Sequence, residues 1–461
     1  MSLASAHLSH DSVEDRQARG KAARQVAPRS AQGSWAPGPD RTDPLGSLLG
    51  QNAIRAQELL PIRHGRMAAS PWTYLRGAAV VMANDLALAP SSGLDVQLCG
   101  DAHVLNFGLW ATPERNLSVD LRDFDETHPG PFEWDVKRLA TSLVVAAREN
   151  SLDAATAEAA VRGALGSYQQ RMLTYRDMHE MDIWYDHIGV DDLVGFFQDQ
   201  QRGEVMKRIE KKGRRRTSLG AFEKLTTVVD GKRVIVDDPP FLTHALTDAS
   251  AERGTDTETV ITEVFKRYRA SLPDDRRALL ERFSFVDTAR KVVGVGSVGM
   301  RVHLLLLQGR DETDPLFLQI KQAGTSVLEP HTRKSRYKNH GERVVQGQRR
   351  IQSSSDIFLG WTRFEEFDFY VRQFKDMKII PESAGVAPVL VEFATACGRV
   401  LARAHARSGD PIAISAYIGK GGSFADAIAQ FAFAYADQTE RDHAQLVAAI
   451  ADGSVPAEAG W

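Results

Sequence analysis

The 461-residue sequence is poor in cysteine, with only Cys99 and Cys397. Two cysteines are too few for a disulfide scaffold or a zinc site built from several thiolates, so we expect a reducing compartment. No run approaches the roughly 18 consecutive apolar residues of a membrane-spanning helix. The N-terminus lacks the basic start and the continuous apolar core of a secretion signal. These absences predict a cytoplasmic protein with no membrane partner.

Net charge is also small, at −3 from 57 basic and 60 acidic residues, which gives no general attraction to nucleic acid. Positive charge is concentrated in one segment, from Lys207 to Ser218, but no aromatic residue is interleaved with it. Because single-stranded nucleic acid is bound by aromatic stacking as well as charge, we interpret this segment as a solvated helix end and loop. We therefore expect no nucleic-acid partner.

What is present is an ordinary globular composition, 43% apolar and 25% charged, over enough residues for about three domains or one large two-lobed unit. Residues 1–50 are rich in Ser, Ala, Gly and Pro and predict a mobile tail. Residues 51–284 have mainly helical patterns, residues 285–380 read as β-rich, and residues 381–461 predict further helices.

Several local patterns predict individual elements. Ser70 before Pro71 is typical of a helix N-cap followed by proline at the first helical position. Apolar residues from Phe132 to Ala147 recur with the helical period and predict a buried helix. Asp230-Gly231 between two β-branched runs predicts a hairpin. A single helix is expected over about 258–283.

The most informative stretch is CGDAHVLNFG, followed by LRDFDETHPGPFEWDVKRLA. Asp101 and Asn106 lie five residues apart, and Asp123 and Asp125 follow the next strand-like segment, LSVDL. Phosphoryl transfer from a nucleotide needs an acceptor for the proton of the attacking hydroxyl and hard oxygen ligands for Mg²⁺. These residue types in this order meet both needs.

A second stretch, VGVGSVGMR, places Gly294, Gly296, Ser297 and Gly299 in a G-x-G-x-x-G arrangement. A dinucleotide fingerprint requires a helix to open at the last glycine, but a β-like run follows here. A glycine-rich loop between two strands is instead the kinase arrangement, in which backbone lies over the phosphates. Lys321, in the next strand LFLQIKQA, is the candidate to reach those phosphates.

The spacing G-D-x-H-x-x-N resembles aminoglycoside and choline phosphotransferases. That resemblance implies Asp101 as catalytic base, Asn106 and Asp123 as Mg²⁺ ligands assisted by Asp125, and His103 and Asp135 as structural support. Asp135 would brace the catalytic loop by accepting its backbone hydrogens. Cys99 departs from the pattern, which usually has histidine there, and Glu329 and Glu342 both remain candidates for the carboxylate partner of Lys321.

The order of these motifs is reversed relative to kinases, in which the glycine loop precedes the catalytic loop. The helix-like segment CGRVLARAHARSG near the C-terminus resembles the one that precedes the catalytic loop in phosphotransferases. Read cyclically, all the parts follow the kinase order, so we interpret the chain as circularly permuted. The expected fold class is α+β, a two-lobed kinase-like fold with a small antiparallel β-rich lobe and a larger mainly helical lobe.

The full set of motifs, from RMAASPWTYLRGAA to CGRVLARAHARSG, resembles the bacterial family called domain of unknown function 2252, over about residues 55–440. That family is grouped with kinase-like folds, and its substrate is not established. Gln322 departs from the acidic residue that the related pattern tends to have.

The sequence as a whole predicts an ATP- and Mg²⁺-dependent phosphotransferase acting on a small-molecule or protein acceptor, with nucleotidyl transfer as a variant outcome. A nucleotide-binding regulatory pseudoenzyme is one alternative. Another is a metal-dependent phosphohydrolase in which Asp101, His103, Asp123 and Asp125 hold the ions. Arg63, Arg66 and Arg76 would add positive potential near a phosphate site if they face it. The sequence does not specify the acceptor or the oligomeric state.

Overall fold

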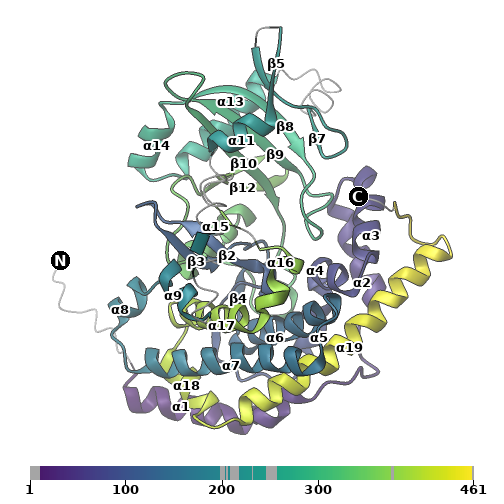
Figure 1. Ribbon diagram of the computed structural model, residues 1–461, viewed down its shortest axis with the longest axis vertical. Coiled ribbons are helices and arrows are strands. Elements are labelled where there is room, and N and C mark those ends of the chain that lie inside the picture. Colours follow the sequence, from purple (N-terminus) through teal and green to yellow (C-terminus); the bar gives the residue numbers. More distant parts are fainter. Residues whose placement is uncertain are drawn as a thin grey trace.

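The computed structural model describes residues 11–197, 203, 206–207, 218–230, 232–244, 257–374, 378–379 and 381–458. Helices make up 53% of the structure and strands 16%, which confirms the predicted α+β class. A sheet-rich region formed within residues 218–379 lies above a larger helical region that takes segments from both ends of the chain (Figure 1). Residues 208–217, most of the basic segment, lie outside the described residues.

The main sheet, within the described part of the chain, has six strands in the spatial order β11-β12-β10-β9-β8-β7. Neighbouring strands are antiparallel throughout. The strands are β7 (Leu242–Thr243), β8 (Ser284–Lys291), β9 (Val302–Gln308), β10 (Pro315–Ala323), β11 (Gly360–Phe364) and β12 (Phe367–Gln373). The predicted β-rich region is therefore confirmed.

Helices cover both faces of this sheet. Leu305 and Leu307 of β9 share a hydrophobic cluster with Tyr268 of α13 (Thr257–Ala270) and with α14 (Asp274–Leu280). Leu304 and Leu306 point the other way, into a cluster that includes α11 (Ser218–Leu225). A strand buried on both faces needs apolar residues at every position, which explains the unbroken leucine run.

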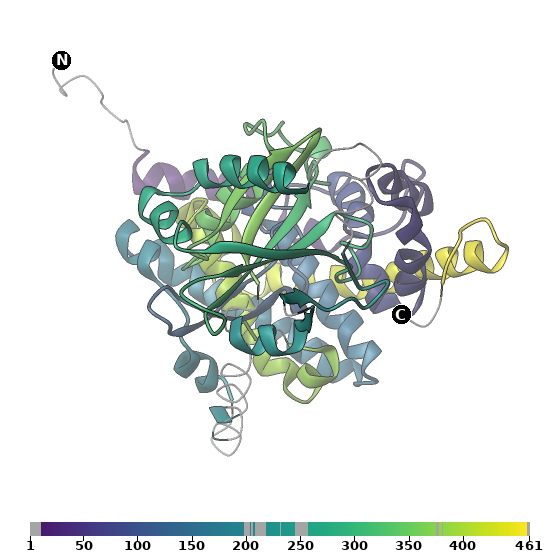
Figure 2. The same cartoon turned by 90° about the horizontal axis from the view of Figure 1, so that it is seen from above.

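The single helix expected over about 258–283 is wrong, since α13 and α14 are separate helices. Pro273 is the N-cap of α14. Proline has no N–H and restricts the residue before it, so the first helix ends at Ala270 and a new one begins at Asp274. Helices α11, α13 and α14 pack on the sheet, so the last part of the stretch 51–284 lies with the sheet rather than with the helical region. Figure 2 shows the strands from above, with helices on both sides of them.

The helical region is built around one buried helix. The principal helices are α6 (Phe132–Glu149), α7 (Ala154–Arg176), α17 (Leu390–Ala406), α18 (Pro411–Ile418) and α19 (Ser423–Ala451). Helices α7, α17 and α19 pack around α6, which buries almost its whole length and confirms the predicted apolar helix. Among the described residues, the stretch Ser383–Ala406 is long and apolar enough to cross a membrane, but half of its most apolar window is buried in this core.

Two small antiparallel two-stranded sheets lie between the helical region and the six-stranded sheet (Figure 1). β1 (Asp95–Leu98) pairs with β4 (His128–Pro131), and β2 (Phe107–Ala111) pairs with β3 (Leu117–Leu121). The β1–β2 connection carries Asp101 and the short 3-10 helix η5 (Val104–Asn106), and the β3–β4 connection carries the other acidic residues of the motif. The strands predicted on either side of the first loop are thus present, and β2 is an additional one.

The expectation of a mobile tail over residues 1–50 is wrong from Asp11 onward. This part forms α1 (Val13–Val26), η2 (Arg29–Gly33) and α2 (Pro44–Gly50). Helix α1 packs closely on α18, so closely that a Cβ at Gly20 would lie 2.1 Å from the Ala413 oxygen. Arg41 pairs with Asp85 at 2.9 Å and with Asp442 at 2.6 Å. Small residues and an ion pair hold this segment, so its low content of large apolar residues was misleading.

The remaining elements surround these regions. They are η3 (Gln51–Ile54), η4 (Gln57–Leu59), α3 (Leu60–Ala68), α4 (Pro71–Gly77), α5 (Ala79–Ala87), α8 (Glu180–Tyr185), α9 (Val190–Gly195), β5 (Thr226–Val229), β6 (Lys232–Ile235), η6 (Glu329–His331), α15 (His340–Ile351), α16 (Ser383–Val386) and η7 (Ala387–Val389). Ser70 caps α4, with its Oγ accepting from the Thr73 N–H at 3.3 Å, as predicted. β5 and β6 form the hairpin predicted at Asp230.

Candidate functional site

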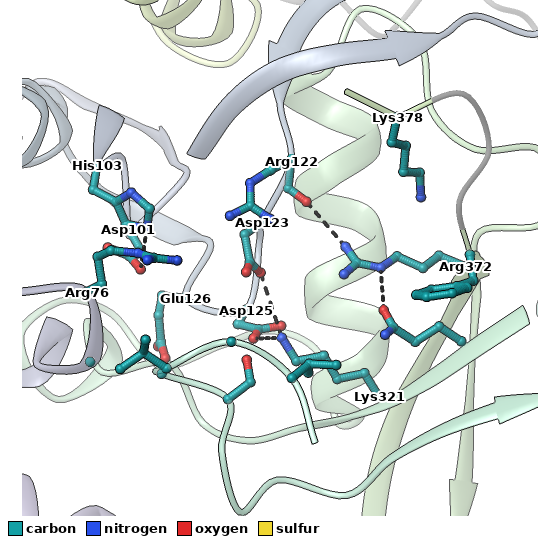
Figure 3. A pocket seen from close by; sticks show the side chains of 18 of the residues that line it. Arg76, Asp101, His103, Arg122, Asp123, Asp125, Glu126, Lys321, Arg372 and Lys378 are labelled. Atoms are coloured by element: carbon teal, nitrogen blue, oxygen red, sulfur yellow. Dashed lines mark hydrogen bonds and ion pairs between the residues drawn. The ribbon is translucent and has the colours of Figure 1, made fainter. Parts of the chain in front are cut away.

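A cavity of about 590 Å³ lies where the sheet, the two carboxylate-bearing connections and the N-terminal helices meet (Figure 3). Its volume falls within the roughly 300–1,000 Å³ of small-molecule sites. The charged residues in its lining are Arg55, Arg76, Arg122, Lys224, Lys321, Arg372 and Lys378, with Asp101, Asp123, Asp125 and Glu126. The excess of basic over acidic side chains suits an anionic ligand.

The predicted glycine loop lies between β8 and β9, and Gly294, Gly296 and Ser297 line the cavity. Gly299 does not line it. Its φ of +85° favours glycine, and a Cβ there would lie 2.9 Å from the Cβ of Arg55. Gly299 therefore permits the close approach of Arg55 to the loop rather than contact with a ligand.

Two arginines from the N-terminal helical segment hold this loop. Arg55 Nη1 donates to the Gly296 oxygen at 2.8 Å and to the Val298 oxygen at 2.6 Å, and Arg66 Nη1 donates to the Gly294 oxygen at 2.6 Å. The loop is thus tied by its carbonyls to residues more than 200 positions earlier in the chain. Of the three arginines considered from sequence, Arg66 contacts the loop, Arg76 lines the cavity, and Arg63 is fully buried away from it.

Lys321 reaches the acidic residues from β10. Its Nζ lies 3.9 Å from Asp123 Oδ1 and forms a close ion pair with Asp125 Oδ2. The Tyr370 hydroxyl donates to the other oxygen of Asp125 at 2.9 Å. The two distant motifs therefore converge, and the carboxylate partner of Lys321 is Asp125 rather than Glu329 or Glu342. Each oxygen of Asp125 thus has one partner, and Asp125 is the counter-ion of Lys321. Its expected role as an assisting metal ligand stays a prediction.

The charges of Lys321 and the neighbouring carboxylates stabilise one another. Burial lowers the pKa of Lys321, but the carboxylates of Asp123 and Asp125 outweigh it and hold the pKa above the usual value. Burial raises the pKa of Asp123, but Lys321, Arg372 and other cations lower it to about 2. Arg372 is fixed by donating to Gln319 Oε1 at 3.0 Å and to the Arg122 oxygen at 3.2 Å. Asp123 is thus ionised throughout the physiological range.

Asp101 lies in the same cavity, held from one side by α6. Arg138 Nε and Nη2 both donate to Asp101 Oδ1, at 2.9 and 2.8 Å. The other oxygen, Oδ2, lies 3.8 Å from His103 Nε2. His103 lines the cavity with its ring edge-on to Trp72, and burial together with nearby arginines lowers its pKa well below the usual value. His103 is therefore neutral, and Asp101 keeps one oxygen directed away from its arginine.

Asn106 does not reach the cavity. It is completely buried, its Nδ2 donates to the Asp101 and Asp123 backbone oxygens at 2.8 and 3.0 Å, and its Oδ1 accepts from the Asp123 N–H at 2.7 Å. The sequence assigned Asn106 as a metal ligand. The structure instead makes it a brace that fixes the two acidic connections to each other, because its short side chain is satisfied by their backbone.

Asp135, at the start of α6, accepts from the backbone N–H groups of Cys99 at 2.7 Å and Gly100 at 3.0 Å. These are the loop hydrogens that the sequence resemblance assigned to it. His405 of α17 lies behind it, with Nε2 3.4 Å from Asp135 Oδ2 and Nδ1 2.8 Å from the Tyr168 hydroxyl. A histidine thus stands near this loop despite Cys99, but it comes from the other end of the chain.

The sequence interpretation missed Arg55, Arg122, Arg138, Arg372 and Glu126. Arg122 directly precedes Asp123, and Glu126 directly follows Asp125, so proximity to the motif was the available signal. The roles of Arg55, Arg138 and Arg372 depend on contacts between distant segments and leave no local pattern. Burial raises the pKa of Glu126 to about 7, although its carboxylate accepts from the Val327 N–H at 2.8 Å.

Within the described ranges, no group of three or more His, Cys, Asp or Glu side chains is placed to hold a metal ion. Arg138 holds Asp101 and Lys321 holds Asp125, so the four residues of the hydrolase alternative are not gathered around one point. Mg²⁺ on a nucleotide is commonly held by one or two carboxylates together with phosphate oxygens. Asp123 fits that use, because its Oδ1 is buried without a hydrogen-bond partner among the described residues.

The structure is that of an α+β protein with a cavity lined by basic side chains and carboxylates. The chain belongs to the family described as "Uncharacterized protein conserved in bacteria (DUF2252)", whose model matches residues 55–449. The family resemblance drawn from the motifs is therefore confirmed. No curated protein and no solved structure gave a significant match to the chain.

Proposed function

We propose that this protein is an ATP- and Mg²⁺-dependent phosphotransferase with a circularly permuted kinase-like fold. The observation that carries the proposal is the approach of the Lys321 amine to within 3.9 Å of Asp123, in a cavity that also contains the glycine loop and Asp101. These segments lie about 200 residues apart in the chain, so their convergence is a property of the fold and not of local sequence.

The strand order supports the kinase-like part of the proposal. The glycine loop joins neighbouring strands β8 and β9, the lysine lies on the next strand β10, helix α15 follows, and the pair β11–β12 completes the series. This is the order of parts in a kinase nucleotide-binding lobe. The catalytic-loop motif stands earlier in the chain, as a permuted connection would place it, and α17 reaches that motif through His405.

The proposed roles follow from the contacts. Asp123 would hold Mg²⁺, which neutralises charge on the phosphates when bound. Lys321 would exchange part of its contact with Asp125 for a phosphate oxygen, and the glycine-loop backbone would cover the phosphates. Asp101 Oδ2 would accept the proton of the acceptor hydroxyl, while Arg138 keeps the carboxylate oriented through Oδ1.

ATP binding and turnover test the proposal in one experiment. Wild type should bind ATP with Mg²⁺ and, with a small-molecule bacterial extract as acceptor source, convert it to ADP. Asp101→Asn should retain binding and lose about 100- to 10,000-fold in turnover, the range for a general base. Asp311→Asn, in the exposed turn between β9 and β10, is the matched control and should leave both unchanged.

Other outcomes separate the alternatives. ATP binding with no turnover in either protein would favour a regulatory pseudoenzyme. Label transferred from the α-phosphate rather than the γ-phosphate would show nucleotidyl transfer. Phosphate-ester cleavage that depends on metal but not on ATP would favour the hydrolase and overturn the proposal.

A further inference from the structure

The wall of the cavity beside Asp101 carries two arginines that have no part in the proposed nucleotide binding. Arg76 and Arg122 lie there with His103, across the cavity from Lys321 (Figure 3). Among the described residues, neither side chain donates a hydrogen bond to the glycine loop.

Arg76 has no hydrogen-bonded anionic partner among the described residues. It lies in the last turn of α4, its guanidinium 5.7 Å from the centre of the Trp72 ring. Its Nε is buried without a hydrogen-bond partner, and no ion pair holds the side chain within the described residues. Burial lowers the pKa of Arg76, and Asp101 and Asp123 offset this only in part. The Arg76 side chain is partly buried and only its Nε is fully enclosed. Partial loss of water around a cation without a hydrogen-bonded anion carries a cost, which a bound anion would reduce.

Arg122 adds a second cation at the same place. Its Nε donates to the Leu105 oxygen at 2.8 Å, which fixes the side chain. Burial and the nearby charge of Arg76 lower the pKa of Arg122, and the carboxylate of Asp123 offsets this only in part. Two guanidinium groups that repel each other beside a neutral His103 form a local positive potential within the cavity.

Most of the buried polar atoms around the cavity that have no hydrogen-bond partner are nitrogen donors. Buried atoms of lining residues without a hydrogen-bond partner, among the described residues, are Arg55 Nε, Arg76 Nε, Trp110 Nε1, His103 Nδ1 and Asp123 Oδ1. The arginine and tryptophan nitrogens can only donate, and Asp123 is the proposed metal ligand. Among these unpartnered atoms, donors outnumber acceptors, and an oxygen-rich ligand would supply the missing acceptors.

We propose that the acceptor is a small alcohol carrying a phosphate or carboxylate group, with this oxyanion bound by Arg76 and Arg122 and its hydroxyl directed to Asp101. The inference rests on the proposed phosphotransferase function and names its substrate class. The hydroxyl oxygen forms a bond to the γ-phosphorus, the bond from that phosphorus to the β–γ bridging oxygen breaks, Asp101 takes the hydroxyl proton, and ADP leaves. Planar guanidinium groups bind both kinds of oxyanion through paired N–H donors.

Calorimetric titration of the protein saturated with Mg²⁺ and a non-hydrolysable ATP analogue tests this. The probes are glycerol 3-phosphate and glycerate, each with an oxyanion and a hydroxyl, and glycerol as the neutral control. We expect at least one of the two anions to bind and glycerol not to bind. The anion that binds distinguishes a phosphate from a carboxylate as the recognised group.

Arg76→Met should weaken anion binding about tenfold to a hundredfold, the range for a lost charge-assisted hydrogen bond, and leave nucleotide affinity unchanged. Arg76→Lys keeps the positive charge but lacks the paired donors of a planar guanidinium. Its anion affinity should lie between those of wild type and Arg76→Met. Arg310→Met removes one exposed positive charge from the β9–β10 turn and is the matched control. Thermal melting of each variant checks its folding.

Three results would overturn the inference. Failure of both anions to bind the nucleotide-loaded protein is one. Unchanged anion affinity in Arg76→Met is another. The third is competition of the anions with the nucleotide, together with loss of nucleotide affinity in Arg76→Met, which would assign Arg76 to the γ-phosphate and leave the phosphotransferase proposal intact. Absence of nucleotide binding would instead refute the proposed function. The anion affinity of the free protein, compared between wild type and Arg76→Met, would then still show whether Arg76 binds the oxyanion.

Discussion

The pairing of Lys321 with Asp125 predicts an unusual stability pattern in a double-mutant cycle. The Lys321 side chain is 3% exposed, whereas those of Asp123 and Asp125 are 33% and 29% exposed. Lys321→Met therefore leaves two partly buried carboxylates facing each other without their shared cation. Removing one partner of a buried pair costs about 3–5 kcal/mol, and the partial exposure of the carboxylates places this case near 3 kcal/mol.

Asp125→Asn alone should cost less, about 1–2 kcal/mol, because Lys321 keeps Asp123 and Asn can still accept from Tyr370. In the Lys321→Met background the same change removes the charge repulsion between the two carboxylates, so it should stabilise the protein by about 1 kcal/mol. The sign of the Asp125→Asn effect thus reverses between the two backgrounds.

Urea unfolding at pH 7, followed by tryptophan fluorescence and circular dichroism, measures the four stabilities. Glu342→Gln is the matched control, since Glu342 was the alternative partner from sequence, and it should show no coupling with Lys321→Met. Additive effects of Lys321→Met and Asp125→Asn, or coupling with Glu342 instead, would refute the assigned pairing.

Three further predictions concern the surroundings of this pair. Asp135→Ala leaves the Cys99 and Gly100 N–H groups without their acceptor, so it should lower the free energy of unfolding by about 2–3 kcal/mol and reduce turnover; wild-type stability in this variant would contradict the bracing role. Because the pKa of Glu126 is raised to about 7 in the folded protein, wild type should lose up to about 3 kcal/mol of stability as pH rises from about 4.5 to 7, and Glu126→Gln should flatten that loss in pH-dependent urea unfolding; an unchanged slope would argue against a raised pKa. Arg55→Gln should release the carbonyls of Gly296 and Val298 and speed amide exchange across residues 294–299, and exchange at the wild-type rate would show that Arg55 does not hold the loop.

The sequence was informative where an element depends on local pattern. The α4 cap at Ser70, the buried helix α6 and the β-rich region all followed from residue spacing. The convergence of Lys321 with Asp123 was also predictable, because each lies in a motif whose residue types have few other uses together.

The sequence was misleading where distant segments decide the outcome. Asp125 fits a metal-ligand pattern, and its pairing with Lys321 and Tyr370 was not predicted from sequence. Asn106 has the right spacing for a ligand, yet the backbone of two connections satisfies it first. The folding of residues 12–50 into helices depends on the close contact of α1 with α18 at Gly20, and amino-acid composition does not predict such a contact. Each case depends on a partner far along the chain.

The most direct test of the central claim is the affinity for ATP, measured by calorimetry with Mg²⁺ and with EDTA, in wild type, Lys321→Met and Asp123→Asn. The account predicts that wild type binds more tightly with Mg²⁺, that Asp123→Asn loses this dependence on Mg²⁺, and that Lys321→Met loses affinity under both conditions. Equal ATP affinity in all three proteins, or no binding by wild type, would contradict it.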